Sequence, residues 1–299
     1  MNTVSMVCEI CRNPNIICKC NSNWVIFDSL ISKNCKGHIK DNVKYSDISI
    51  STMTVCFNFN KPILLDKLRE KLMGLLSINY KPGSKKSKVP KKKGTDSFYN
   101  SFDIKIGITD YFKEPKVFSN VSIFIFPNGK VKVAGAKTIN TINILTDELI
   151  ELIGNDYVDS DSVELIAENI TIHMICSDFK IKPVVKDPDG WCIKQEILKN
   201  ILVKEYSLSA TFSALSRYPG INLKVPSIID NTKNISLLIF RSGSIIITGA
   251  KNAKDIANCY QFITNIICSN AEQLFYHDIN EELKQKKKKR EKKKEKLSN

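Results

Sequence analysis

Apolar and polar residues alternate along much of the first half of the chain, which is the pattern of half-buried β-strands. Between these runs the apolar positions take helical spacing: leucines follow Pro62 at intervals of four, and apolar residues recur over 142–153. Pro127-Asn128-Gly129 predicts a tight hairpin turn. The expected elements are strands at 48–59, 98–108, 117–126 and 130–136, and helices from residue 62 and over 142–153.

The second half of the chain repeats this order of elements. Ser242-Gly243 marks a second hairpin turn, and apolar residues at helical spacing after Asn252 predict a long helix that continues into a lysine-rich end. The expected elements here are strands at 170–181, 208–215, 221–225, 235–240 and 244–249, and helices at 191–203 and 253–276.

A shift of 114 residues aligns 123–137 with 237–251, with six identical positions out of fifteen. Because the order of the surrounding elements is duplicated too, and only two copies are present, the sequence predicts two copies of one α+β unit rather than a solenoid of short repeats. The identical pairs are Ile125/Ile239, Phe126/Phe240, Gly129/Gly243, Gly135/Gly249, Ala136/Ala250 and Lys137/Lys251.

The formal net charge of +14 is concentrated in two short segments. Residues 284–296 carry +8 and residues 81–94 carry +7, which leaves the rest of the chain at −1. A near-neutral body excludes nucleic-acid binding through a broad basic coat, so binding would need a few well-placed cations and apolar contacts. We expect 81–94 to be a solvated loop, and 284–296 to be either a solvated extension or an arm that binds phosphates.

The chain contains no stretch of eighteen apolar residues, and it does not begin with a basic segment followed by an apolar one. We therefore expect an intracellular protein without membrane contact, in which the ten cysteines are reduced thiols or metal ligands. Histidines 38, 173 and 277 have no nucleophile pattern near them, and no metalloprotease, P-loop or dinucleotide motif is present. We expect no catalytic activity and no small-molecule substrate.

Four cysteines lie within thirteen residues near the start of the chain, with Cys35 and His38 behind them. Four thiolates suffice for a closed, tetrahedral structural zinc site, so the sequence predicts zinc here; the alternative is four ordinary cysteines. The predicted ligands are Cys8, Cys11, Cys18 and Cys20. The cysteines at 56, 176, 192, 259 and 268 stand in apolar contexts, and we expect them in the core.

The sequences IFIFPNGKVKVAGAK at 123–137 and LLIFRSGSIIITGAK at 237–251 resemble the core motif of the TATA-box-binding protein (TBP) family. Tyr218-Pro219-Gly220-Ile221 resembles the family's F-P-G element, which is followed by Leu or Ile. The resemblance covers roughly residues 46–279, and in character it is nearer to the TBP-like proteins of large DNA viruses than to cellular TBP. It implies an α+β fold: a pseudo-twofold saddle of two repeats, each a curved antiparallel sheet with helices on the convex face.

The resemblance also implies a function. The concave sheet would bind the minor groove of double-stranded, A·T-rich promoter DNA and bend it with inserted phenylalanines. Partners would be transcription initiation factors or RNA polymerase, in the nucleus or in a viral factory, with packaging in the virion as a further option. Residues carried over from the family as DNA contacts are Phe102, Phe126, Tyr218 and Phe240 as wedges, Lys130, Lys137 and Lys251 at phosphates, and Thr248 in the groove.

Several positions depart from the family's pattern. Ala134 stands where the second copy has Thr248, Ser244 replaces the counterpart of Lys130, and Lys132 takes the place of an apolar groove residue. The central asparagine pair of the family has no match, since Ile48 and Ile172 fall near those positions. The alternatives are therefore a saddle-shaped scaffold for other proteins, or an architectural protein that binds DNA without sequence preference through its lysine-rich end.

These observations divide the chain into five parts. We expect a Cys-rich segment at 1–45, a first TBP-like repeat at 46–154 that includes the lysine-rich loop, a linker at 155–165, a second repeat at 166–279, and a disordered lysine-rich tail at 280–299.

Overall fold

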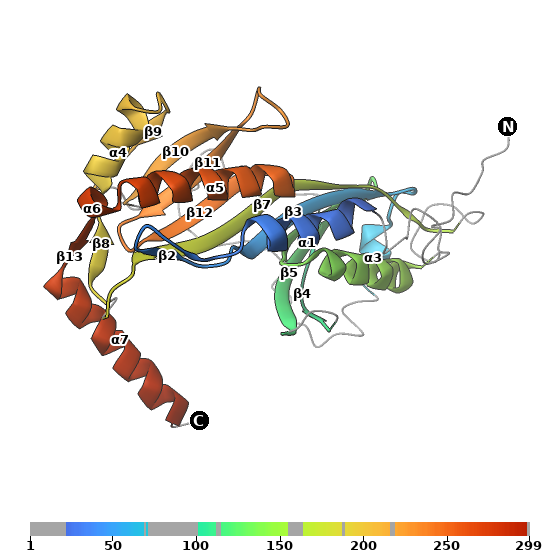
Figure 1. The fold of residues 1–299 in the computed structure, drawn as a ribbon. Helices are drawn as coiled ribbons and strands as arrows, with labels where there is room; N and C mark the ends of the chain where they lie inside the picture. The colour runs from blue at the N-terminus through green and yellow to red at the C-terminus, as the bar shows by residue number, and fades with distance from the viewer. Residues whose placement is uncertain are drawn as a thin grey trace. The chain divides into compact units, whose positions relative to one another are not determined.

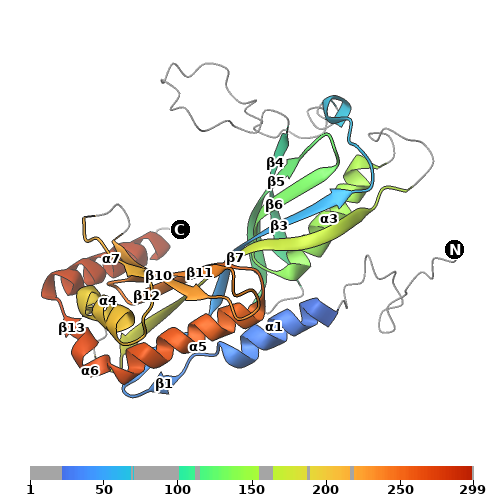
Figure 2. The ribbon, with the colours of Figure 1, turned by 90° about the horizontal axis from the view of Figure 1, so that it is seen from above.

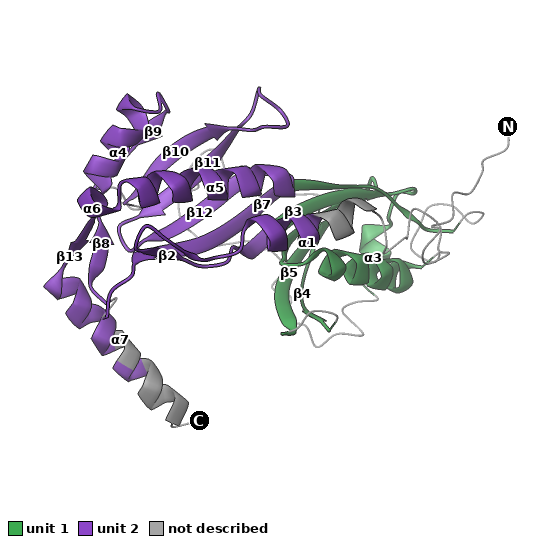
Figure 3. Cartoon of the chain, in the orientation of Figure 1, with its two compact units in different colours: residues 1–21, 53–173 green, residues 22–52, 174–299 purple. Residues whose placement is uncertain are grey.

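The computed structural model describes residues 22–68, 70, 101–111, 115–154, 164–186, 189–215 and 219–297 (Figure 1). The chain divides into two compact units (Figure 3): unit 1 holds residues 1–21 and 53–173, and unit 2 holds residues 22–52 and 174–299. Two long strands, β3 (Ser49–Phe59) and β7 (Ala167–Pro183), contribute residues to both units. Within the described residues, every helix is too short or too polar to cross a membrane.

Unit 1 is an antiparallel sheet with a helix packed on one face. Its strand order is β4-β5-β6-β3, and the helix α3 contacts β4 and β6. Alternate residues of each strand are buried, for example Ile123 and Val133, which face each other across β5 and β6. The elements are β4 (Phe102–Asp110), β5 (Val117–Ile125), β6 (Lys130–Ala136) and α3 (Ile139–Ile153).

Unit 2 has the same kind of architecture. Its antiparallel strand order is β7-β12-β11-β10-β9; the helix α5 packs on β12, and α4 packs on β9 and β10. The register of the β11–β12 hairpin, in which Leu237 faces Ile247, matches that of β5–β6 after a shift of 114 residues. The elements are α4 (Gln195–Lys204), β9 (Ala210–Thr211), β10 (Gly220–Pro226), β11 (Asn234–Phe240), β12 (Ser244–Ala250) and α5 (Ala253–Ser269).

The α+β class predicted from the sequence is confirmed, and so are the two hairpins and the helix that follows each of them. Alternating burial along the strands and 3.6-residue periodicity along α3 and α5 account for this success, because each pattern buries one face of its element.

Residues 22–45 form part of unit 2, although the sequence assigned them to a separate Cys-rich segment. The helix α1 (Ser22–Asn34) lies along α5, and the hairpin of β1 (Ile39–Lys40) and β2 (Val43–Tyr45) pairs through β2 with the end of β7 (Figure 2). The Tyr260 hydroxyl donates a hydrogen bond to the Ser46 carbonyl at 2.8 Å. Buried Phe27, Cys35, Val43 and Tyr45 explain the difference: these apolar residues lack a clear period, and the Tyr45 ring packs edge to face against Tyr260 of α5.

Two predicted helices differ from the structure. The helix expected over 253–276 ends at Ser269, because the Asn270 side-chain amide donates to the Ile266 carbonyl and its backbone N–H to the last carbonyls of α5. After α6 (Ala271–Leu274) the chain forms β13 (Phe275–His277), which pairs with β8 (Trp191–Ile193). Residues 191–203 therefore begin as a strand and only then form α4. The strand expected at 208–215 is limited to the two residues of β9.

The lysine-rich tail, expected to be disordered, forms the helix α7 (Ile279–Leu297). Asp278 accepts hydrogen bonds from the Asn280 and Glu281 N–H groups and so caps the first turn. Lys284 and Lys286 pair with acids three and four residues earlier, Glu281 and Glu282. A capping aspartate and acids in the first turn favour a helix start, a signal that the charge count alone does not reveal.

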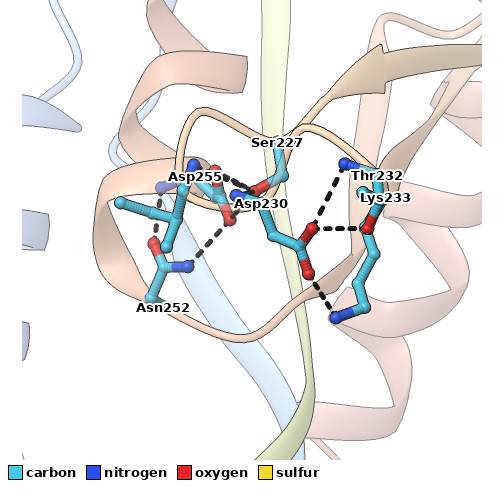
Figure 4. Close-up of polar contacts among 7 residues, drawn as sticks. Ser227, Asp230, Thr232, Lys233, Asn252 and Asp255 are labelled. Atoms are coloured by element: carbon cyan, nitrogen blue, oxygen red, sulfur yellow. Dashed lines mark hydrogen bonds and ion pairs between the residues drawn. The ribbon is translucent and has the colours of Figure 1, made fainter.

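In each unit a buried carboxylate ties a strand end or the loop that follows it to the start of a helix. In unit 1, Asp110 at the end of β4 accepts hydrogen bonds from Thr138, at 2.6 Å, and from Asn140. In unit 2, Asp255 in the first turn of α5 accepts bonds from the Ser227 hydroxyl, at 2.8 and 3.0 Å, and from the Ile228 N–H, at 2.9 Å (Figure 4). These ties hold the ends of the sheets in place.

Candidate nucleic-acid interface

One face of each sheet packs against helices; we call the other its open face. The open face of unit 2 is largely apolar at its centre, where Leu238 and Ile246 are half-buried neighbours on β11 and β12. These two residues belong to a row of neighbours that runs across the sheet. From β10 to β7 this row reads Asn222, Leu238, Ile246 and Asp178. The next row reads, from β10 to β7, Lys224, Ser236, Thr248 and Cys176.

Phe240 occupies the end of β11 on this open face. A Cβ added to Gly220, its partner on β10, would lie 3.2 Å from Cε1 and 3.3 Å from Cδ1 of the Phe240 ring, so the ring rests directly on the glycine. Gly243 has a φ of +80°, and its N–H donates to the Phe240 carbonyl at 3.0 Å. This tight turn fixes Phe240 at the end of β11, with its side chain half-buried.

Thr248 lies inside the open face and not at its edge. Its hydroxyl lies 3.6 Å from the Met174 sulfur and is half-buried. Across from it, burial raises the pKa of the Cys176 thiol, an effect that the hydrogen bond with Thr248 partly offsets. Threonine, methionine and cysteine together make a surface that is weakly polar and carries no charge at neutral pH.

The open face of unit 1 has a different chemistry at matching positions. Its central row reads, from β4 to β3, Asp103, Phe124, Lys132 and Cys56, and the next row reads Lys105, Ser122, Ala134 and Thr54. Phe126 is half-buried and stands at the turn after β5, where the Gly129 N–H donates to its carbonyl at 3.0 Å. Phe126 and Phe240 thus hold equivalent places, but the central strand pair carries Phe124 and Lys132 in unit 1 and Leu238 and Ile246 in unit 2.

Phe102 does not join Phe126 on the open face. It is 6% exposed and points to the helix side of β4, as does its partner Ile125 on β5. The register shows why: Asp103, opposite Phe124, corresponds to Asn222, opposite Leu238, so Phe102 corresponds to the buried Ile221. A one-residue change of register moves a side chain to the other face. Tyr218 lies outside the described residues.

The predicted cations lie at strand ends. Lys137 and Lys251 are exposed and immediately precede the capping residues of α3 and α5, Thr138 and Asn252. Lys130 is exposed at the start of β6, opposite Asn58 of β3. All three side chains are therefore free of the core and available to an anionic ligand.

Sequence reasoning missed part of both open faces. The residues that it did not place on these faces are Leu238, Ile246, Met174, Cys176, Lys180 and Lys224 in unit 2, and Cys56, Lys105 and Phe124 in unit 1. Strand alternation could have identified the open-face residues of the two hairpins. Leu238 stands two residues before Phe240, and Ile246 two residues before Thr248, and residues two apart in a strand share a face.

The cysteines divide into three groups. The predicted zinc ligands Cys8, Cys11, Cys18 and Cys20 lie outside the described residues, so that site stays a prediction; the described part of the chain contains no group of three side chains that could hold a metal. Cys35, Cys192, Cys259 and Cys268 are buried, and burial raises the pKa of Cys35 and of Cys259 to about 12. Cys56 and Cys176, expected in the core, instead lie half-buried on the open faces.

The comparisons with known proteins found a family model, a viral relative and a solved structure. Residues 200–269, which include β10, β11, β12 and α5, match the family model of transcription factor TFIID, or TATA-binding protein (TBP). A TATA-box-binding protein-like protein of Acanthamoeba polyphaga mimivirus is 25% identical over 300 residues, covering 92% of this chain and 78% of that protein. The solved TBP of Methanococcus jannaschii aligns with 74% of this chain and 97% of its own, at 20% identity and a TM-score of 0.45.

The match to the family model contains Phe240, Thr248 and Lys251 of the motif that first suggested the family. The comparisons therefore confirm the resemblance predicted from the sequence: the chain is similar to the TATA-box-binding proteins, through its second unit and through a viral TBP-like relative.

Proposed function

We propose that this chain is a DNA-binding transcription initiation factor that binds the minor groove through its open faces and bends promoter DNA. The resemblance to TBP supports the general role, which is DNA binding in transcription without catalysis. The observation that carries minor-groove binding is the open face of unit 2, where Leu238, Ile246 and Thr248 form an uncharged centre flanked by Asp178 and Lys224, with Phe240 at the end of β11.

Such a surface suits the minor groove and not the phosphate backbone. Apolar side chains that replace water in the groove lower the free energy of the complex. A ring at the end of a strand is placed to enter between base pairs. The guanine amino group projects into the minor groove, whereas A·T pairs present only acceptors there. Leu238 and Ile246 would leave that amino group without a partner, so we expect unit 2 to favour A·T-rich DNA.

The cations then position the duplex. Lys137 and Lys251 would contact phosphates at the ends of β6 and β12, and Lys130 would do so in unit 1. Transcription initiation factors or RNA polymerase would bind elsewhere on the molecule. The protein would act where the genome is transcribed, in the nucleus or in a viral factory.

Two cysteines allow a direct test of the open faces. Cys56 of unit 1 and Cys176 of unit 2 are half-buried thiols in the proposed interface. We expect a saturating A·T-rich duplex to slow their alkylation by iodoacetamide at least about tenfold, because bound DNA would exclude the reagent. The rates are measured by mass spectrometry at pH 8.5, since thiolates carry the reaction and burial raises the pKa of Cys176.

Cys35 and Cys259 serve as internal controls. Both are buried, with pKa values of about 12, and should react slowly whether or not DNA is present. Equal labelling of Cys56 and Cys176 with and without DNA, under conditions in which the duplex is bound, would contradict the proposed interface. DNA binding would then depend on other surfaces, as in the architectural alternative.

A further inference from the structure

The helix α7 carries a charge that its own acids do not balance. In its first two turns, Glu281 and Glu282 pair with Lys284 and Lys286. From Lys287 to Lys296 the sequence has eight cations and two glutamates, a net charge of +6. Lys287 and Arg290 are exposed. In Figure 1 the ribbon of α7 extends away from α5.

The start of α7 is firmly attached to unit 2. Arg241, in the turn between β11 and β12, donates to the Tyr276 hydroxyl at 2.7 Å and pairs with Asp278, the residue that caps α7. The Asp278 N–H donates to the Gly190 carbonyl at 2.8 Å. The Nε2 atom of His277 lies 3.2 Å from Oε2 of Glu282, and the His277 ring contacts the Trp191 ring in an edge-to-face arrangement.

This attachment, which we call the Arg241 anchor, persists at neutral pH. The pKa of the Asp278 carboxyl is lowered, first by the hydrogen bond from the Glu281 N–H and then by Arg241, so the carboxylate is charged. Gly190 has a φ of +82°, and a Cβ there would lie 2.7 Å from Cβ of Glu282. The backbones of the two segments are thus in close contact.

We propose that α7 is a second DNA contact, held by the Arg241 anchor so that it binds the phosphates of the same duplex beyond the segment covered by the open faces. The inference rests on the proposed function for the identity of the duplex. Charge complementarity favours a polyanion, and the anchor sets the place of α7 on the DNA because Arg241 leaves the same turn that positions Phe240.

The expected size of the effect follows from the length and charge of the helix. Nineteen residues span about 28 Å, or about eight base pairs. Each phosphate contact adds about 0.9 to the slope of log affinity against log salt concentration. Of four successive cations on a helix, about two can face a duplex, because successive side chains diverge by about 100°.

The test compares the full-length chain with three variants. In the first, Lys287→Gln, Lys288→Gln, Lys289→Gln and Arg290→Gln remove four charges while keeping strong helix formers. Its matched control exchanges lysine and arginine at the same positions and keeps the charge. The third, Arg241→Met, retains every charge of α7 but removes the anchor. All are measured on a 40-base-pair A·T-rich duplex by salt-dependent binding, hydroxyl-radical footprinting and fluorescence measurement of bending.

We expect the glutamine variant to bind about tenfold more weakly at 0.1 M salt, with a salt slope smaller by about 2. It should lose protection of up to about eight base pairs at one end of the footprint and still bend the DNA. The charge-preserving control should match the wild type. Arg241→Met should lose the defined protection at that end while retaining most of the salt slope.

An unchanged slope and footprint in the glutamine variant would overturn the proposal and leave RNA or an acidic protein as the partner of α7. Failure of the proposed function looks different: the wild type would then bind DNA without bending it. In that case a reduced slope in the glutamine variant would still support α7 as a DNA contact.

Discussion

A chain carrying Phe126→Ala and Phe240→Ala is expected to bind A·T-rich DNA about 100-fold more weakly than the wild type and to lose DNA bending. Contact between an aromatic ring and a base contributes about 1–3 kcal/mol, so removal of two rings accounts for a loss of this size. The bend should disappear because the small alanine side chain cannot hold two base pairs apart.

The fold should survive this double change. Both phenylalanines are half-buried at strand ends, and the Phe240 ring rests on Gly220 rather than in the core of unit 2. Their truncation creates no internal cavity, so we expect circular dichroism and the melting temperature to change little. The measurement is energy transfer between dyes at the two ends of a short duplex, with titrations for affinity.

Phe118→Ala supplies the matched control. Phe118 is an aromatic residue of β5 on the same open face as Phe126, but it stands at the other end of the strand and is 51% exposed. We expect this variant to bend DNA as the wild type does. Full bending by the Phe126→Ala/Phe240→Ala chain would rule out these two rings as wedges, and equal loss in the Phe118→Ala chain would point to general damage of the surface.

Asp255→Ala is expected to lower the free energy of unfolding of unit 2 by about 3 kcal/mol. Asp255 is 3% exposed, and its carboxylate accepts hydrogen bonds from Ser227, from the Ile228 N–H and from Asn252. Alanine leaves these donors without a partner in a buried place and releases the loop between β10 and β11. Urea unfolding followed by tryptophan fluorescence reports the change, since Trp24 and Trp191 both belong to unit 2.

The same loop provides the control. Asp230 lies three residues after Ser227 and accepts hydrogen bonds from Lys233 and Thr232, which lower its pKa to about 2 (Figure 4). Because these contacts are at the surface, Asp230→Ala should leave the unfolding midpoint almost unchanged. A loss of stability at Asp230 equal to that at Asp255 would mean that the loop itself, and not its attachment to α5, stabilises the unit.

Periodicity was sufficient to predict the hairpins and the helices that follow them. Each element buries one face, at every second residue in the strands and at helical spacing in α3 and α5. It was insufficient where tertiary contacts decide the structure. The break after Ser269 depends on the Asn270 side chain, and the attachment of α1 depends on apolar residues without a clear period. The helical form of α7 depends on a capping aspartate just before a run of like charges.

The residues of the candidate site could be predicted where a motif also fixes the strand register, and so the face of the sheet on which a side chain lies. The motif that contains Phe240 and Thr248 includes the turn between their strands, which fixes their register, and both residues lie on the open face. Phe102 was placed without such a turn, and one residue of uncertainty put a buried side chain among the wedges. Cys56 and Cys176 were assigned to the core because an apolar neighbourhood in sequence does not tell which face of a strand a thiol occupies.

The central claim is that the open faces read the minor groove. Duplexes in which inosine·cytosine pairs replace adenine·thymine pairs test it most directly, because they present the major groove of G·C but lack the guanine amino group in the minor groove. We predict affinity within about threefold of the A·T duplex for the inosine duplex, and at least about tenfold weaker binding to the G·C duplex. An inosine duplex that is bound as weakly as G·C would contradict minor-groove recognition.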